Sequence, residues 1–473
     1  MQNNKVFSIL QKFDTYEQNR LRKFVQSPYF NRNERLEKLL EILLKDVKSD
    51  HTTISFNRNE IWRKIGHKST YDDVKLRKDF SDLLRLTEKF IAQEHYEKNG
   101  LYEAEFLLSA IHEKKMSKLE AGTKKLATRL LERFPLRSSE YYLHAFKLDR
   151  SKFLMNHNIQ VKGEKKNIET VSKNLDIFYI CEKIRYYCYI ISSQRITTHK
   201  YELKMLKEVI QEVEDSEYKE IPAIAIYYQH YLTLIDVENE AHYFKLKSLL
   251  DQYGLIFPKE EAYNLYTSTT NYCARKVNSG QPKFLEEYFD IMVDFIEKEI
   301  IFLDDFLAPG IFDNMVTTGL RLEKFLWVES FIKKYSDKLV TKYRENVVTF
   351  NTARLHWYRK DFDIVIRLLI EVEYDEIHYN LISKTMLITT YYDTNEIEPL
   401  FSLLGSFRTF LNRHKEIPQH RRDLYLNLIR FIKKMVNTLP NDKKAIEKLH
   451  KEIIETKSIA NKDWLLEKLA ELS

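Results

Sequence analysis

The residues that could do chemistry are 14 histidines, three cysteines and two adjacent carboxylate pairs, Asp72-Asp73 and Asp304-Asp305. A general acid and a general base must face one substrate, but neighbouring residues on a helix point about 100° apart. We therefore interpret both pairs as helix caps or surface charge. The chain contains no HExxH, CxxC, GxGxxG, GxxxxGK[ST] or GxSxG pattern, which are the common signatures of zinc, nucleotide and acyl-transfer sites. The sequence predicts that the protein is not an enzyme and has no metal or cofactor site.

The histidines and cysteines fit structural roles. Cys181 and Cys188 are seven residues apart in a helical stretch, which places their Cα atoms about 10 Å apart, too far for a disulfide. We expect these two residues and Cys273 to be buried free thiols, as in a reducing cytosol. The histidines occur singly, and three of them lie beside aromatic residues in helical stretches, where we expect packed or surface side chains: His144, His230 and His356.

The composition predicts helices. Only 9 of the 473 residues are glycine and 9 are proline, although sheets and phosphate-binding loops need these residues in their turns. Hydrophobic residues make up 44% and charged residues 31%, which is enough to bury a core in a soluble chain. No run of about 18 apolar residues is present, and the N-terminus lacks the pattern of a secretory signal. We expect an all-α cytoplasmic protein without membrane insertion.

Capping signals place the first helices. Asp14 to Glu17 has the pattern of a capping box, as has Thr70 to Asp73, and Asn33 can cap a helix between them. The helix that follows Thr70 is expected to stop at Asn99-Gly100, because glycine commonly ends helices. We predict an N-terminal helical unit over residues 1–100, followed by an α-solenoid of helical hairpins over residues 101–473.

A 34-residue spacing suggests a repeat. Gly319, Ala353 and Leu387 follow each other at this interval, and a large residue or a helix start comes about nine residues later, at Val328, Phe362 and Asn395. A small residue opposite a large one lets two antiparallel helices approach closely. The segment "ARLHWYRKDFDIVIRLL" resembles the tetratricopeptide motif, whose period is also 34 residues. The resemblance is best over residues 312–415 and implies a tetratricopeptide-like solenoid. It is degenerate, because Phe331, Val365 and Pro399 replace the small residue of the second helix.

Three further segments resemble bacterial helical-repeat proteins of no assigned activity: Ser27–Leu36, Leu83–Phe90 and Tyr391–Ile417. This resemblance implies a fold and no activity. Solenoids present concave surfaces to protein or peptide partners, and tyrosine is common in such interfaces. We therefore predict a non-enzymatic binding scaffold, with four aromatic residues as candidate contacts with the partner: Trp357, Tyr358, Tyr391 and Tyr392.

The charge distribution leaves an alternative open. Residues 1–200 hold 39 basic and 26 acidic residues, whereas residues 201–473 hold 37 and 44. A basic N-terminal half could bind nucleic acid or regulate through it, with a helix over residues 56–65 and the next helix acting as a helix-turn-helix-like reader. Interspersed acids such as Asp72 and Asp82 oppose this hypothesis by lowering the local potential. Seven residues are its candidate contacts: Arg58, Arg63, Lys64, Lys75, Arg77, Lys78 and Arg85.

Overall fold

The computed structural model describes residues 4–49, 57–157, 167–195, 197–302, 304–370 and 377–472. These residues form 23 α-helices and three short 3₁₀ helices, and they contain no β-strand beyond one isolated bridge between Leu307 and Leu339. The prediction of an all-α fold is confirmed. The chain divides into two compact units, Met1–Ile235 and Asp236–Ser473.

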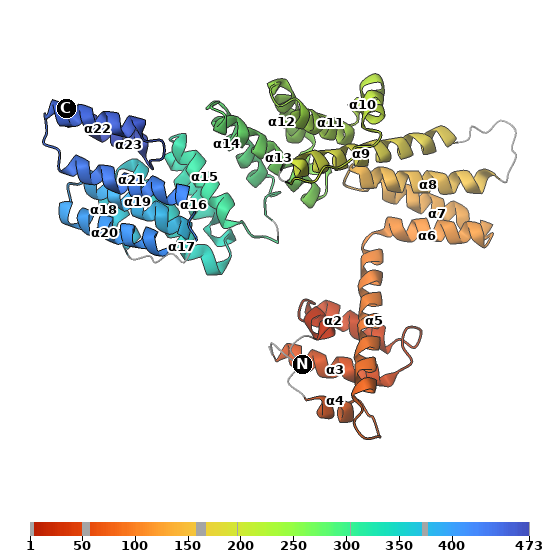
Figure 1. The fold of residues 1–473 in the computed structure, drawn as a ribbon. Helices are drawn as coiled ribbons and strands as arrows, with labels where there is room; N and C mark the ends of the chain where they lie inside the picture. Colours follow the sequence, from red (N-terminus) through yellow and green to blue (C-terminus); the bar gives the residue numbers. More distant parts are fainter. Residues whose placement is uncertain are drawn as a thin grey trace. The chain divides into compact units, whose positions relative to one another are not determined.

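The first unit holds eleven α-helices and one 3₁₀ helix, shown from red to light green in Figure 1. They are α1 (Lys5–Leu10), α2 (Thr15–Gln26), α3 (Glu34–Lys48), α4 (Arg58–Lys64), α5 (Asp73–Lys98), α6 (Gly100–Glu113), α7 (Ser117–Glu132), α8 (Ser139–His157), α9 (Ile168–Gln194), α10 (Leu206–Asp215), η1 (Glu217–Glu220) and α11 (Pro222–Ile235).

The second unit holds the other twelve α-helices and two 3₁₀ helices. They are α12 (Glu240–Tyr253), η2 (Gly254–Ile256), α13 (Lys259–Asn278), α14 (Phe284–Glu297), α15 (Pro309–Arg321), α16 (Phe325–Tyr335), η3 (Ser336–Lys338), α17 (Thr341–Arg359), α18 (Phe362–Ile370), α19 (Ile377–Asp393), α20 (Ile397–Arg413), α21 (Gln419–Val436), α22 (Lys443–Glu455) and α23 (Lys462–Ala470).

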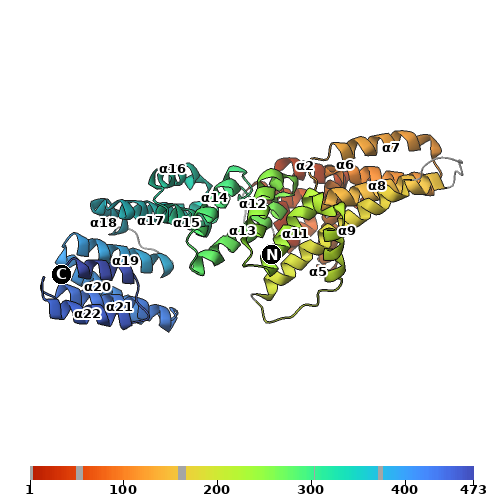
Figure 2. The same cartoon turned by 90° about the horizontal axis from the view of Figure 1, so that it is seen from above.

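Helices pack mainly on their neighbours in sequence. In the first unit α6 packs on α7, and α8 packs on α9. In the second unit α13 packs on α14, α15 on α16, α17 on α18, and α19 on α20. Further contacts join α15 to α17 and α17 to α19, so that consecutive pairs are stacked, as Figure 2 shows for the teal and blue helices. The predicted arrangement in sequential helix pairs is confirmed.

The N-terminal helices have a hydrophobic core of their own. Leu10, Leu21, Leu43, Trp62 and Leu83 belong to one cluster that draws on α1 to α5, while a separate cluster begins with Leu101 in α6. The sequence-based boundary at residue 100 coincides with the change from one cluster to the other. It lies inside the first compact unit and not at the division between the two units.

The capping predictions were right in part. Asp14 and Glu17 form the expected capping box, and Asn33 caps α3. The expected box at Thr70 is wrong, because α5 is capped by Asp72, whose carboxylate accepts hydrogen bonds from the N–H groups of Val74 and Lys75. The stop at Asn99-Gly100 has a different cause from the one expected. Asn99 is extended and caps α6, and Gly100 is the first residue of that helix.

The turns inside the helix pairs share one backbone geometry. Glu323, Lys360 and Asn395 adopt φ values of 57°, 63° and 58° in the turns after α15, α17 and α19. In each turn the next N–H group donates to the carbonyl five residues earlier, at 2.9, 2.9 and 2.8 Å, as in a Schellman motif. A side chain costs about 1–2 kcal/mol in this left-handed conformation. The chain therefore builds repeated turns with almost no glycine, which explains how so helical a protein can hold so few.

The 34-residue spacing corresponds to real helix contacts. A Cβ atom on Gly319 would lie 2.5 Å from Cγ2 of Val328, so the close approach of α15 and α16 requires a glycine there. Ala353 is completely buried in α17, and Leu387 is buried in α19. The expected helix start at Asn395 is wrong by two residues, because Asn395 forms the turn and α20 begins at Ile397.

Candidate partner-binding surface

The cysteines and paired aspartates that the sequence offered for chemistry are buried thiols, a helix cap or exposed loop residues. No group of three or more histidine, cysteine, aspartate or glutamate side chains in the described part of the chain could hold a metal ion. Asp72 caps α5, whereas Asp304 and Asp305 are exposed in the loop before α15. All three cysteines are buried and free, as predicted. Burial raises the pKa of the Cys188 thiol, and it raises that of Cys273 to about 12, so both stay protonated at neutral pH.

His144 is the most enclosed of the three singled-out histidines. Its ring is fully buried between Tyr102 and Phe134. Its Nδ1 atom is paired with Glu105 of α6, and its Nε2 atom lies 3.3 Å from Nδ2 of Asn99. His230 is also buried, and His356 contacts Asp361 at 2.9 Å in the turn after α17. These contacts agree with the prediction of packed or surface histidines.

The four predicted aromatic contacts are mostly engaged inside the second unit. Trp357 donates from Nε1 to Oγ1 of Thr389 at 3.1 Å, which joins α17 to α19, and its ring meets Tyr358 edge-on. Tyr391 exposes only 8% of its surface. Tyr392 packs edge-on against Trp464 of α23, and the C-terminal helix therefore covers this part of α19. Tyr391 is buried, so little of its surface is available to a partner, and the four candidate contacts remain a prediction.

Many other tyrosines join helices through their hydroxyl groups. Tyr243 of α12 donates to Glu287 of α14 at 3.0 Å, and Tyr266 of α13 donates to Asp294 at 2.5 Å. Desolvation is the main cause that raises the pKa of both phenols. The hydroxyl groups are thus neutral donors at physiological pH. Helix packing accounts for these buried tyrosines, which leaves the exposed ones as candidates for binding.

Exposed aromatic residues gather on one face of α9. Tyr179, Tyr186 and Tyr189 are 37%, 54% and 41% exposed, and Leu175 is 41% exposed one turn before Tyr179. Their spacing of four, seven and three residues places them on one side of the helix. We call Leu175, Tyr179, Tyr186 and Tyr189 the α9 tyrosine face.

The opposite side of α9 explains why this face is oriented outward. Ile177, Ile180, Cys181, Ile184 and Cys188 are buried where α9 packs against α8 and α11. They lie at helical spacing on the side that packs, so burying them fixes the rotation of the helix about its axis. Tyr186, Tyr187 and Tyr189 are close together in the sequence. The structure separates them, because Tyr187 is buried and donates to the carbonyl of Lys204 at 2.6 Å.

Lys183, Arg185 and Met205 lie beside the α9 tyrosine face. The ammonium group of Lys183 lies 5.9 Å from the Tyr179 ring centre, and the hydroxyl group of Tyr179 lies 3.3 Å from Sδ of Met205. The guanidinium group of Arg185 lies 5.3 Å from the Tyr186 ring centre while it is paired with Glu182. Aromatic rings, methionine and flanking cations are typical of protein interfaces, where they offer contact area and a site for an acidic residue of the partner.

Four of the seven predicted nucleic-acid contacts are paired with carboxylates. Arg58 and Arg77 both pair with Asp73, Lys75 lies 3.5 Å from Asp72, and Arg85 lies 2.8 Å from Asp82. Arg63, Lys64 and Lys78 are exposed. Among the described residues, the first helix of the expected helix-turn-helix is α4, which begins at Arg58. Residue 56, where the sequence placed its start, lies outside the described residues. Four of the seven cations are thus engaged with carboxylates of the same helix pair.

Comparison of the chain with protein-family models, curated proteins and solved structures finds no match. Among the helices that the structure describes, none combines the length and the hydropathy that a membrane-spanning segment requires. The structure therefore establishes an all-helical protein whose helices pack in sequential pairs, and it assigns no family.

Proposed function

We propose that this protein is a non-enzymatic scaffold that binds a protein or peptide segment, and that the α9 tyrosine face is a principal contact. The observation that carries the proposal is the exposure of three tyrosines on one side of a helix whose other side is fully packed. Tyrosine supplies a large contact area at a small entropic cost, and its hydroxyl group can bond across an interface.

The helical pairs from α15 to α20 support the finer proposal of a tetratricopeptide-like array. Their shared turns, the contact between Gly319 and Val328, and the 34-residue spacing fit a repeated hairpin. The separate cluster of the first five helices supports an N-terminal unit over residues 1–100. Three buried free thiols fit a reducing compartment, so we propose that the scaffold works in the cytoplasm.

For the alternative function, nucleic-acid binding, α7 offers better candidate contacts than α4 and α5. Lys124, Lys125, Thr128, Arg129 and Glu132 line a surface hollow of about 480 Å³. Lys124 pairs with Glu120, whereas Lys125 and Arg129 are exposed and have no ion pair within the described residues. A basic helix of this kind would contact phosphates without reading sequence.

A pull-down with the full chain, with and without nuclease, distinguishes the two functions. Under the scaffold proposal one protein is retained in both conditions by the wild type. It is lost with a triple variant that carries Tyr179→Ala, Tyr186→Ala and Tyr189→Ala. The matched control is Tyr16→Ala, which removes a tyrosine that is 76% exposed on α2. Retention by the triple variant would reject the α9 tyrosine face, and loss of all binding after nuclease treatment would favour nucleic acid.

A further inference from the structure

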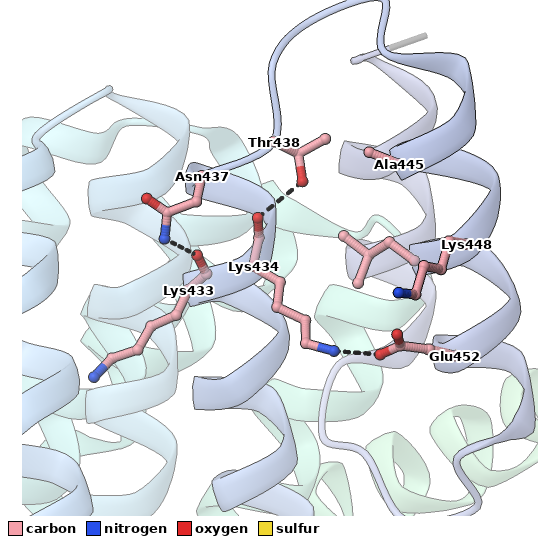
Figure 3. Close-up of a pocket in the computed structure, with 8 residues that line it drawn as sticks. Lys433, Lys434, Asn437, Thr438, Ala445, Lys448 and Glu452 are labelled. Atoms are coloured by element: carbon pink, nitrogen blue, oxygen red, sulfur yellow. Dashed lines mark hydrogen bonds and ion pairs between the residues drawn. The ribbon is translucent and has the colours of Figure 1, made fainter.

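A lysine-lined pocket lies between α21 and α22 in the second unit (Figure 3). Its volume is about 390 Å³, large enough for an amino-acid side chain with its flanking backbone. We call it the lysine pocket. It is lined by Lys433, Lys434, Asn437, Thr438, Ala445, Lys448, Leu449 and Glu452. No motif in the sequence marks this site.

Ordinary helix packing forms the lysine pocket. Phe431, Ile432 and Met435 of α21 are buried, as are Leu449 and Ile453 of α22. Burying these apolar sides directs the intervening lysines outward along both helices. The end of α21 is held by side chains, because Asn437 donates to the carbonyl of Lys433 at 2.7 Å and Thr438 donates to that of Lys434 at 2.9 Å.

The charges in the lysine pocket do not balance. Three lysines and one glutamate line it. Lys434 is paired with Glu452, as Figure 3 shows, and this contact is the largest cause that lowers the pKa of the Glu452 carboxyl. Lys448 and Arg430 lower it further through their charges. Lys433 and Lys448 form no ion pair with any residue that the structure describes, so two cations stay available at the edges of the pocket.

The pocket suits a carboxylate better than a phosphate. Phosphate sites usually present several backbone N–H groups, as at the N-terminus of a helix or in a glycine-rich loop. Here the N–H group of Ala445 is already taken by the side chain of Asp442 at 3.1 Å. The walls also include Ala445, whose half-buried methyl group offers apolar contact to the carbons of a side chain. A glutamate or aspartate side chain combines an apolar stem with one negative charge.

We propose that the lysine pocket binds an acidic peptide segment, with Lys433 and Lys448, which lie at opposite edges of the pocket, contacting separate carboxylates of the ligand and Ala445 contacting the carbon chain between them. Glu452 competes with the carboxylates of the ligand for Lys434, with which it is paired when no ligand is present. The pocket is distinct from the α9 tyrosine face, so either site can fail in experiment while the other holds.

The test is fluorescence anisotropy of the full chain with a fluorescein-labelled peptide of alternating glutamate and leucine. We expect the double variant Lys433→Gln, Lys448→Gln to bind about tenfold more weakly, since each exposed ion pair contributes modestly. Glu452→Gln should bind about threefold more tightly, because it frees Lys434 and removes a repelling charge. The control Lys443→Gln, Lys457→Gln removes two charges from exposed lysines outside the pocket and should change affinity less than about twofold.

Several outcomes would overturn the proposal. One is a wild-type chain that fails to bind the peptide, and another is an equal loss in the control variant, which would indicate general attraction between charges. A third is unchanged or weaker binding by Glu452→Gln. A fourth is that inorganic phosphate or a DNA hairpin competes at lower concentration than unlabelled peptide, which would assign the pocket to phosphate ligands. The pull-down with the α9 triple variant is read separately, so failure of the lysine pocket leaves the scaffold proposal intact.

Discussion

The helix pairs α4–α5 and α21–α22 both carry many cations, but they use them differently. In α4–α5 the carboxylates of Asp72, Asp73 and Asp82 engage four of the basic side chains. In α21–α22 Glu452 engages Lys434 alone, and Lys433 and Lys448 have no ion pair among the described residues. The number of basic residues in a segment therefore does not measure its attraction for anions. The attraction depends on which carboxylates the fold places close enough to pair with the basic side chains.

The two helix pairs differ again in where their acids lie. Asp79 of α5 is only 4% exposed and lies 2.7 Å from Nε2 of His67. The ring of His67 stacks on Trp62 at a centroid distance of 3.5 Å, and Arg35 reaches the other Asp79 oxygen at 3.6 Å. In the C-terminal pair, the side chains of Lys434 and Glu452 remain 44% and 35% exposed. The first pair thus contains a buried acid with two partners, whereas the acid of the second pair forms an ion pair at the surface.

The largest expected effect is that of Asp79→Ala. It leaves the half-buried His67 and the exposed Arg35 without their acceptor, and should lower the free energy of unfolding by about 2–3 kcal/mol. Glu452→Gln should lower it by less than about 0.5 kcal/mol, because exposed ion pairs contribute little. Hydrogen exchange of amides in α5 and in α22 measures each helix pair within the full chain. Equal protection losses would show that the two acids have the same structural role.

A substitution in the turn after α4 should also lower stability more than a substitution in the turn before α22. Gly66 ends the turn after α4 with φ 96°, and its N–H group donates to the carbonyl of Arg63 at 3.1 Å. Gly66→Ala should cost about 1–2 kcal/mol, because a side chain is strained in that conformation. Asn441, with φ 65°, precedes α22, and Asn441→Gly should change stability by less than about 0.5 kcal/mol, since asparagine tolerates it. Thermal melting followed by circular dichroism measures both, and a destabilised Asn441→Gly would show that its side chain is needed.

The sequence alone predicts the helices well and the sites poorly, and individual residues show why. Helix starts depend on local contacts, so Asp14 and Asn33 could be assigned from their neighbours. Pairing between charges depends on rotation and on contacts across helices. Arg58 meets Asp73 across fifteen residues, and Lys434 meets Glu452 across eighteen. The sequence identifies the basic residues, but it does not show which carboxylates they pair with in the fold. For that reason the predicted nucleic-acid contacts are largely paired and the lysine pocket was missed.

Removing the acids of α5 should make the first helix pair resemble the second. Asparagine caps helices as well as aspartate does, so the double variant Asp72→Asn, Asp73→Asn keeps the start of α5 while it releases Arg58, Lys75 and Arg77. We expect the slope of log affinity against log salt for short duplex DNA to steepen by about 2, from counterions that the freed cations displace. A filter-binding titration at several salt concentrations measures the slope. An unchanged slope would mean that these cations lie too far apart to contact one duplex.

The smallest expected effect concerns acid pH. Hydrogen bonds from the backbone of Lys75 lower the pKa of the Asp72 carboxyl, and the hydroxyl group of Tyr71 lowers that of Asp73. A carboxyl whose pKa is lower in the folded state contributes stability above its unfolded pKa, about 4, and loses it as the pH falls further. The protection of amides in α5, measured relative to the intrinsic exchange rate at each pH, should therefore fall between pH 5 and pH 3 in the wild type and less so in the double asparagine variant. In α22, protonating Glu452 should free Lys434 with little change in exchange. If both helices opened alike in acid, the lysines of the second pair would depend on their acid as much as the arginines of the first, and the contrast between structural and available cations would be lost.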